Sequence, residues 1–324
     1  MSDIGTTIDL KRVKNTPKVV TIGEMLVEIM RRDVDVPLGK PAEFVGPFPN
    51  GAPAIFIDAV AKLGISAGII GSVGRDEFGE CIMRRLEGDG VDTSIVKRIG
   101  NLSTGMTFVS YRSDGSRRFI YHMENSAAGA ITAADVPEEY VRKASVIHIS
   151  GSSLDMGAGM REACYKAIEI GRRAGAYISF DPNIRKELGS ERLMEMFSPV
   201  LESCTLFIPT SDELVEICGT GEKEAAKMML ERGVEVVAVK DGKRGCRIYT
   251  KDPRVEAPTF EHIKAVDPTG AGDAFSAAVV VGYLEGMDPS KLAVFANAAG
   301  SCAVSAKGPM EGLAWKDRIE EMMR

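Results

Sequence analysis

A glycine-rich turn followed by an acid, Gly270-Ala271-Gly272-Asp273, is the part of this sequence whose residue types most directly suggest chemistry. Glycines let a backbone take positive φ or approach a ligand closely, so the amides of residues 270–272 can converge on an oxyanion. The apolar run that follows predicts a helix, whose N-terminal end adds partial positive charge. Asp273 would stand in its first turn, where it either caps the helix or takes a proton. A base beside an oxyanion hole suits phosphoryl transfer to a hydroxyl.

Length and composition indicate a globular protein with a small-molecule partner. The 324 residues can bury a large core, and 44% hydrophobic with 27% charged residues is ordinary for a soluble fold. A net charge of −6 gives no basic surface for nucleic acid, and no apolar run approaches the ~20 residues of a membrane helix. Six cysteines without a CxxC pair, and the lack of an apolar signal core, predict a reduced, cytoplasmic protein. The three histidines have no metal-ligand spacing.

Strands and helices must hold the turn, and the hydrophobic pattern predicts them. Residues 1–16 have no period and are expected to be a loose tail, whereas residues 19–23 predict a buried first strand. Farther on, helices alternate with strands predicted at 146–149, 177–181, 206–209 and 234–239. This alternation predicts an α/β fold with a doubly wound, mostly parallel sheet flanked by helices. Because such sheets bind ligands at the carboxyl ends of their strands, polar residues at these ends are expected to surround the turn.

The nine residues from Asp267 to Phe275, DPTGAGDAF, resemble the C-terminal signature of the ribokinase/PfkB family of sugar and nucleoside kinases. Earlier segments that resemble motifs of this family, in the same order, are 46–64, 69–79, 181–185 and 209–213. The resemblance spans residues 18 to 320. It implies a ribokinase-like fold, ATP and Mg²⁺ as cofactors, and transfer of the γ-phosphoryl group to a primary hydroxyl of a small sugar.

Residues 106–111 and 117–121 flank a Ser-Asp-Gly-Ser turn, and this pattern predicts a β-hairpin outside the main sheet. The resemblance implies a small β-sheet lid made of residues 31–48 and 96–124, beside an α/β domain made of residues 17–30, 49–95 and 125–324. For Arg112, Arg117 and Arg118, a solvated hairpin face is favoured over ligand contact. Because an isolated hairpin with an apolar face is marginal in water, we expect a homodimer joined lid to lid.

The resemblance also implies which side chains meet the sugar. Asp273 would be the general base, with the backbone of Gly270, Ala271 and Gly272 as the anion hole. The sugar itself would contact Glu28, Asn50, Gly51, Arg185 and Asp273. For Glu28 a solvated acid at a strand end, and for Arg185 a salt bridge that stabilises a loop, are the alternatives.

Further residues would meet the nucleotide and the metal ions. By resemblance, the nucleotide would contact Asn183, Lys240, Gly242, Gly245, Thr269, Gly270, Gly272 and Asn297. A packed helical asparagine is an equal alternative for Asn297. Glu213 would order the water ligands of Mg²⁺. A monovalent cation such as K⁺ would take oxygens from Asp267, Thr269, Ala303, Ala306 and Gly308.

Three positions depart from the family pattern. Asn50 stands where the first glycine of a pair is usual, and Ile55 and Thr210 stand where asparagines are usual. These departures leave a non-catalytic sugar-binding regulator on the same fold as one alternative. A Rossmann dehydrogenase is disfavoured because Phe275 occupies the third glycine position of GxGxxG and the motif lies near the C-terminus. The sequence contains no GxxxxGK[ST] motif, which excludes a P-loop kinase.

The segment after the hairpin bears on the substrate. Family members that phosphorylate 2-keto-3-deoxygluconate commonly carry an arginine shortly before a Ser-Ala pair, where this chain has Met123, and the adjacent Glu124 would repel an acid. We therefore predict a neutral ketohexose, tagatose or fructose, held by Glu28 and the Asn50-Gly51 turn. The keto-acid is the alternative, with Arg185 or a hairpin arginine supplying the positive charge, and a nucleoside is less favoured.

Overall fold

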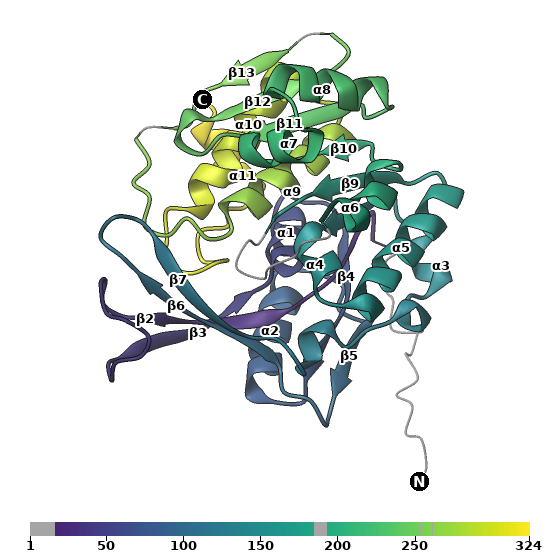
Figure 1. The fold of residues 1–324 in the computed structure, drawn as a ribbon. Coiled ribbons are helices and arrows are strands. Elements are labelled where there is room, and N and C mark those ends of the chain that lie inside the picture. The colour runs from purple at the N-terminus through teal and green to yellow at the C-terminus, as the bar shows by residue number, and fades with distance from the viewer. Residues whose placement is uncertain (1–16, 185–192, 253, 261) are drawn as a thin grey trace.

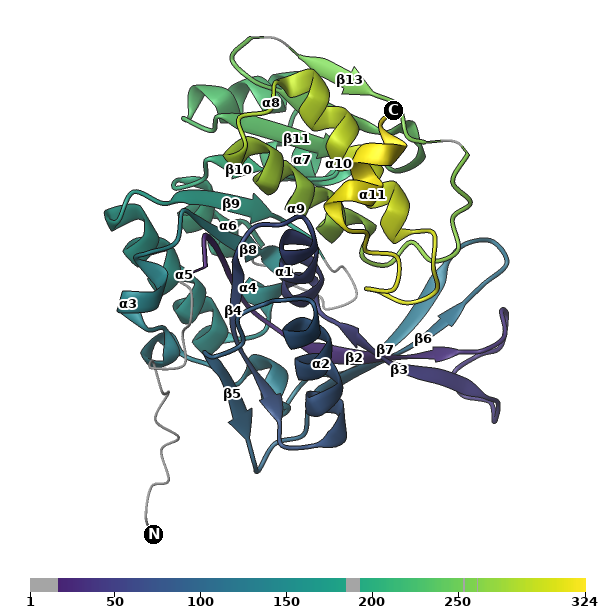
Figure 2. The same cartoon turned by 180° about the vertical axis from the view of Figure 1, so that it is seen from behind.

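The computed structural model describes residues 17–184, 193–252, 254–260 and 262–324, and it contains a large sheet and a small sheet (Figures 1 and 2). The large sheet has the strand order β13-β12-β11-β10-β9-β8-β1-β4-β5. Its strands are β1 (Val19–Ile22), β4 (Ala67–Gly74), β5 (Val96–Ile99), β8 (Val146–Ser150), β9 (Tyr177–Asp181), β10 (Leu206–Phe207), β11 (Val236–Lys240), β12 (Cys246–Tyr249) and β13 (Val255–Ala257).

Neighbouring strands of the large sheet pair in parallel from β5 through β11, whereas β12 pairs antiparallel with both β11 and β13. This arrangement confirms the predicted doubly wound, mostly parallel sheet. Parallel strands need crossover connections, and here helices supply most of them. The helices are α1 (Ala52–Lys62), α2 (Glu77–Gly88), α3 (Glu138–Val141), α4 (Gly151–Asp155), α5 (Ala158–Arg173), α6 (Leu193–Leu201), α7 (Ser211–Cys218), α8 (Glu222–Glu231), α9 (Ala271–Leu284), α10 (Pro289–Ala303) and α11 (Lys316–Met322).

Two hydrophobic clusters cover the two faces of the large sheet. Because side chains alternate along a strand, Val19 of β1 joins one cluster and the next residue, Val20, joins the other. The first cluster packs α1, α2, α9, α10 and α11 on one face, and the second packs α3 to α8 on the opposite face. The sheet is therefore buried on both sides, which explains why its strands are almost continuously apolar. No helix in the described residues is long and apolar enough to cross a membrane.

The small sheet projects to one side of the molecule (Figure 1). Its order is β3-β2-β6-β7, with β2 (Leu26–Arg31), β3 (Phe44–Asn50), β6 (Gly105–Tyr111) and β7 (Arg117–His122). The predicted hairpin is confirmed as β6 and β7, which pair antiparallel. We call this four-stranded sheet the lid.

The strands depart from the residue limits expected for the lid at three places, and one of these is the end of β3 at Asn50, beyond residue 48. β2 already starts at Leu26, where it pairs in parallel with Gly105 of β6, so the small sheet begins before residue 31. β5 lies within the expected range 96–124 but pairs with β4 in the large sheet. The long strand β4 leaves its last residues, from Gly71 to Gly74, available for that pairing.

Candidate active site

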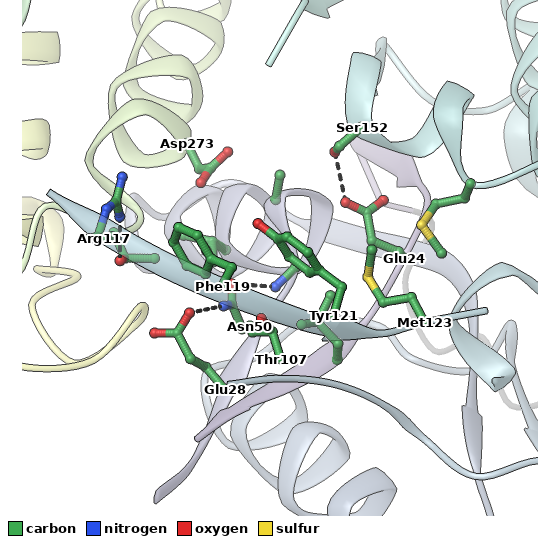
Figure 3. Close-up of a pocket in the computed structure, with 16 residues that line it drawn as sticks. Glu24, Glu28, Asn50, Thr107, Arg117, Phe119, Tyr121, Met123, Ser152 and Asp273 are labelled. Carbon is green, nitrogen blue, oxygen red and sulfur yellow. Dashed lines mark hydrogen bonds between the residues drawn. The ribbon is translucent and has the colours of Figure 1, made fainter. Parts of the chain in front are cut away.

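A pocket of about 570 Å³, counted out to solvent, opens between the lid and the large sheet (Figure 3). Asp273 lines one wall from the first turn of α9, and Arg117, Phe119 and Tyr121 line another from β7. The floor includes Gly51 and the first residues of α1. The pocket therefore lies at the carboxyl ends of the parallel strands, as the topology predicts.

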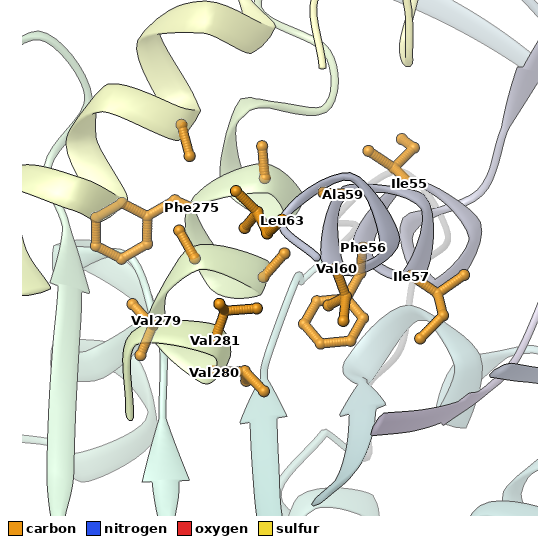
Figure 4. Packing of buried hydrophobic residues seen from close by; sticks show 14 of the residues in the cluster. Ile55, Phe56, Ile57, Ala59, Val60, Leu63, Phe275, Val279, Val280 and Val281 are labelled. Carbon is orange, nitrogen blue, oxygen red and sulfur yellow. The ribbon is translucent and has the colours of Figure 1, made fainter. Parts of the chain in front are cut away.

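Packing fixes the two helices that begin at this pocket. α9 is apolar on nearly every face and packs beside α1, and both helices contribute side chains to the first hydrophobic cluster (Figure 4). Interlocking side chains in a close-packed core resist small displacements. The N-terminal ends of α1 and α9, which carry Gly51 and Asp273 to the pocket, are thus held in fixed relation.

The turn before α9 needs glycine for a steric reason. Gly270 is the N-cap residue, with φ of 83°, and a Cβ there would collide with the carbonyl oxygen of Pro309. No side chain caps α9, so its first-turn amides remain available to an anion. The amides of the predicted anion hole thus lie at an uncapped helix end, and their contact with an anion remains a prediction.

Asp273 is buried, with 7% of its surface exposed, and Asn183 lies beside it. The side-chain amide of Asn183 donates a hydrogen bond to Asp273 Oδ1 at 3.3 Å. Asn183 itself has φ of 40°, in the left-handed region that asparagine tolerates better than most residues. The structure therefore brings together the predicted base and one of the residues predicted to contact the nucleotide.

Asp181, at the end of β9, contacts two polar side chains near Asn183 and Asp273. Its Oδ2 atom forms an ion pair with Lys240 Nζ at 2.6 Å and accepts a hydrogen bond from Ser276 Oγ at 2.8 Å. A Cβ built on Gly272 would lie 3.7 Å from Lys240 Nζ, so the ammonium reaches the first turn of α9. Sequence reasoning gave Lys240 a role but none to Asp181, although the position of Asp181 at a strand end was the signal.

The residues predicted to bind the sugar also meet in the pocket, apart from Arg185, which lies outside the described residues. Asn50 Nδ2 donates to Glu28 Oε2 at 2.9 Å, and the amide of Gly51 donates to Asn50 Oδ1 at 2.6 Å. Glu28 is 1% exposed and belongs to β2 of the lid, so it is not a solvated acid at a strand end. Ile55, on the first turns of α1, also lines the pocket.

Glu24 is a further acid in the pocket wall, and it follows β1. Its two carboxylate oxygens accept hydrogen bonds from Ser152 Oγ at 2.7 Å and Ser153 Oγ at 2.6 Å, both on α4. A carboxylate that accepts hydrogen bonds can be buried at lower cost. These residues follow β1 and β8, whose ends are neighbours in the large sheet.

Arg117 corrects the expectation that the hairpin arginines are solvated. Side chains alternate along β7, so Arg117 faces the pocket while Arg118 is exposed on the opposite face. Arg117 Nη1 donates to Thr269 Oγ1 at 3.0 Å. Arg112 lies near the hairpin turn, where its Nε atom is 3.8 Å from Oδ2 of the exposed Asp114.

The residues predicted to surround a monovalent cation are only partly brought together by side-chain contacts. Asp267 Oδ1 accepts from the amide of Thr269, and its Oδ2 accepts from the amide of Gly308, both at 3.0 Å. Ala303 ends α10, and Ala306 lies in the turn that leads to Gly308. The segments that carry all five residues therefore adjoin.

Two residues predicted to contact the nucleotide, Asn297 and Gly245, lie against the end of β13, and a third, Gly242, is in the same turn as Gly245. Asn297 Nδ2 donates to the carbonyls of Ala257 at 2.8 Å and Pro258 at 3.1 Å. A Cβ on Gly245 would collide with the same Ala257 carbonyl, and Gly242 begins the turn that contains Gly245. The side chain of Asn297 thus has a packing role, and its contact with a nucleotide remains a prediction.

Glu213 has structural bonds on both carboxylate oxygens. Oε2 accepts from the amide of Thr210 at 2.7 Å, and Oε1 accepts from the amide of Ile184 at 2.8 Å. Thr210 Oγ1 accepts in turn from the amide of Glu213 at 3.2 Å, which completes a capping box on α7. Glu213 thereby fixes the segment after Asn183, and its contact with Mg²⁺ waters remains a prediction.

A buried histidine can be excluded as the base. Burial lowers the pKa of His148 to about 3, and its ring stacks on Phe56 with the ring centres 3.6 Å apart. The described residues contain no cluster of three or more histidines, cysteines and acids that could hold a metal ion. Asp273, the α9 amides, Asn183 and Lys240 lie together at this end of α9, and their chemical roles remain predictions.

The fold and this pocket together are those of the ribokinase-like class of kinases, with a lid beside a pocket that Asp273 lines from the first turn of α9. The chain belongs to the pfkB family of carbohydrate kinases, because the model described as "pfkB family carbohydrate kinase" matches residues 16–316. This match confirms the resemblance given by the DPTGAGDAF run. The protein is therefore a carbohydrate kinase.

Individual relatives extend along nearly the whole chain. "Probable fructokinase-5" of Arabidopsis thaliana is 31% identical over 323 residues, covering 96% of this chain and 98% of the relative. "Fructokinase-1" of Oryza sativa subsp. japonica is 31% identical, covering 94% and 97%. A solved structure described as "a putative Ribokinase II in complex with ATP and Mg+2 from E.coli" is 39% identical with a TM-score of 0.90, covering 95% and 99%.

Proposed function

We propose that this kinase transfers the γ-phosphoryl group of ATP to a primary hydroxyl of a neutral ketohexose, fructose or tagatose. The observation that carries this proposal is the shared pocket of Asp273 and the Glu28-Asn50-Gly51 group. Glu28 and Asn50 offer a carboxylate and an amide, which suit sugar hydroxyls as acceptor and donor. The plant relatives named as fructokinases also support a ketohexose.

In the proposed mechanism, Asp273 accepts the proton of the sugar hydroxyl. The hydroxyl oxygen forms a bond to the γ-phosphorus while the bond between that phosphorus and the β–γ bridging oxygen breaks, and ADP leaves with the electron pair. The amides at the start of α9 stabilise negative charge on the phosphoryl oxygens. The hydrogen bond from Asn183 holds the carboxylate of Asp273 in position.

The residues present fit a triphosphate. The uncapped end of α9 and the ammonium of Lys240 beside Gly272 form a positive site of the kind that binds phosphate. Mg²⁺ bound to the phosphates would neutralise their charge during transfer. It commonly keeps several water ligands and needs few protein carboxylates, which agrees with a role for Glu213 through water.

We also propose that a monovalent cation such as K⁺ binds between the Asp267-Thr269 segment and the segment from Ala303 to Gly308. Asp267 is buried with 1% of its surface exposed, and the bond from Gly308 draws the two segments together. Carbonyl and carboxylate oxygens suit such a hard cation. Replacing KCl with tetramethylammonium chloride at equal ionic strength should lower kcat several-fold, and an unchanged kcat would rule this site out.

Arg117 favours one second candidate, the acid 2-keto-3-deoxygluconate. A guanidinium in the pocket can pair with a carboxylate in a bidentate manner, and sequence reasoning had left a hairpin arginine as one source of this charge. Against this candidate, Glu24, Glu28 and Asp273 line the same pocket and disfavour an anion. The neutral ketohexose therefore remains our proposal.

A coupled assay of ADP release tests the proposal across neutral ketoses, aldoses, nucleosides and 2-keto-3-deoxygluconate. We expect the highest kcat/KM with fructose or tagatose. A value at least ~10²-fold higher for the keto-acid, equivalent to about 2.7 kcal/mol, would replace the ketohexose by the acid. ADP release that no sugar accelerates would instead favour a non-catalytic regulator.

The lid presents an apolar face away from the pocket, and we propose that a second copy of the chain covers it. Ile120 is 47% exposed and lies directly opposite Phe108 on β6. Phe44 of β3 packs edge-on against Phe108, with the ring centres 5.6 Å apart. A contiguous apolar face on a thin sheet is costly to leave in water. These residues support a homodimer joined lid to lid.

A further inference from the structure

Two side chains of the lid hairpin bond to the loop that precedes α9. Tyr111 ends β6, and its hydroxyl donates to Asp267 Oδ1 at 2.7 Å and lies 3.3 Å from Thr269 Oγ1. Arg117 begins β7, and its Nη1 donates to Thr269 Oγ1 at 3.0 Å. The two residues are direct cross-strand partners in the hairpin. They therefore contact the loop as one rigid pair.

The loop has little freedom to absorb a movement. Asp267 holds Thr269 through its amide and Gly308 through the other carboxylate oxygen, both at 3.0 Å. Thr269 directly precedes Gly270, whose backbone lies so close to the Pro309 carbonyl that a Cβ would not fit between them. A shift of Thr269 must consequently move the first-turn amides of α9. Burial raises the pKa of the Tyr111 hydroxyl, which therefore stays protonated and can donate to Asp267.

The same hairpin carries the wall of the sugar pocket. Phe119 and Tyr121 follow Arg117 at alternate positions of β7 and line the pocket with it (Figure 3). In a strand, residues two apart lie on one face. A sugar seated against these rings would fix β7, and through it the position of Arg117.

We propose that Tyr111 and Arg117 are positioning residues that couple the sugar-binding lid to the phosphate-binding end of α9. This inference rests on the proposed function, because it assigns the pocket under β7 to a sugar and the α9 amides to ATP. Sugar binding would place the amides for the γ-phosphate, and ATP binding would hold the lid over the sugar. Such coupling is reciprocal by thermodynamic necessity and is typically about 5- to 150-fold in affinity.

Isothermal titration tests the coupling without turnover. The ligands are a non-hydrolysable ATP analogue with Mg²⁺ and the best sugar from the ADP-release assay. In the wild type we expect saturating sugar to lower the dissociation constant of the ATP analogue at least ~5-fold. In Tyr111→Phe, which removes only the hydroxyl, we expect coupling below ~2-fold and separate affinities within ~3-fold of wild type. In the same variant, kcat should fall about 10-fold, and the KM for sugar at saturating ATP should rise by about the coupling factor that is lost.

Matched variants separate this role from a structural one. Arg117→Met should also lose coupling, whereas Arg118→Met, on the exposed face of the same strand, should keep it. Tyr165→Phe removes a hydroxyl that bonds the carbonyl of Met196 on α6, and it should keep coupling too. Coupling retained in folded Tyr111→Phe, or in Arg117→Met if the first variant does not fold, would overturn the proposal.

The outcome also distinguishes this inference from the function on which it rests. A wild-type enzyme that phosphorylates a sugar but shows no coupling would refute the link between lid and α9 alone. A wild-type enzyme that phosphorylates no sugar would refute the proposed function, and the inference would fall with it.

Discussion

The side-chain amide of Asn183 lies 3.3 Å from Asp273 Oδ1, although 90 residues separate the two positions in the chain. The contact joins the loop that directly follows β9 to the first turn of α9. Asp273 also lines the pocket that Glu28 and Asn50 line. A carboxylate held in this way at the pocket wall is placed to act as a base.

The first prediction concerns this acid. Asp273→Asn should keep the fold, because the side chain has nearly the same shape, but it cannot accept the hydroxyl proton. Loss of a positioned base typically costs about 10²- to 10⁴-fold in rate. We expect kcat to fall by this factor in the ADP-release assay, with little change in nucleotide affinity. Near-full activity of the variant on a good sugar would exclude Asp273 as the base.

The second prediction concerns the ion pair of Lys240 with Asp181. Their side chains are only 12% and 2% exposed, so Lys240→Met leaves a buried carboxylate without its cation. Breaking such a buried pair typically costs about 3–5 kcal/mol of unfolding free energy. Urea denaturation should show this loss, and it should be smaller in the double variant Lys240→Met with Asp181→Asn.

Nucleotide affinity separates the two roles of Lys240. Because the ammonium reaches the first turn of α9, both the single and the double variant should bind ATP more weakly, by about 10-fold or more. A double variant that recovers stability and also binds ATP like the wild type would assign Lys240 a structural role only.

Sequence reasoning succeeded where the signal was local. Alternating strands and helices predicted β8, β9 and β11, and the Ser-Asp-Gly-Ser turn predicted the hairpin of β6 and β7. Glycine spacing predicted the start of α9, where the steric demand lies within a few residues. In each case the physical cause acts between near neighbours in the chain.

The misses involve orientation and distant contacts. Alternation along β7 separates Arg117 from Arg118, but it does not say which face meets the pocket. The bond from Tyr111 to Asp267 joins positions 156 residues apart, and the ion pair of Lys240 with Asp181 joins positions 59 apart. No local periodicity encodes such pairs, which depend on how the lid and the large sheet pack.

The third prediction concerns assembly. Light scattering at micromolar concentration should give twice the 34.8 kDa mass of the chain. Ile120→Asp places a charge on the apolar face of the lid and should shift the mass to that of the monomer. Val215→Glu, which changes an exposed apolar residue on α7 instead, should leave the dimer intact. A monomer for the wild type would reject the lid-to-lid dimer.

The fourth prediction concerns the buried Asp58 of α1, which is 0% exposed. No N–H or hydroxyl group of the described residues donates to its carboxylate oxygens, and a hydrogen bond with the Asp89 carboxyl group favours the protonated form. Burial and the nearby charge of Asp89 raise the pKa of Asp58 well above its usual range, against smaller opposing effects of Lys62 and Arg85. The folded protein therefore binds a proton at this site that the unfolded chain has already released.

The sign of the pH dependence follows from this proton. Stability is unaffected by Asp58 below its ordinary pKa of 3.8 and falls as the pH rises from there toward the raised value in the folded state. Asp58→Asn cannot ionise, so the variant should gain unfolding free energy relative to wild type as the pH rises from 4 to 8. Urea denaturation across this range measures the difference. The exposed Asp212→Asn should leave the profile nearly unchanged, and an Asp58→Asn profile parallel to that of the wild type would show that Asp58 ionises normally in the fold.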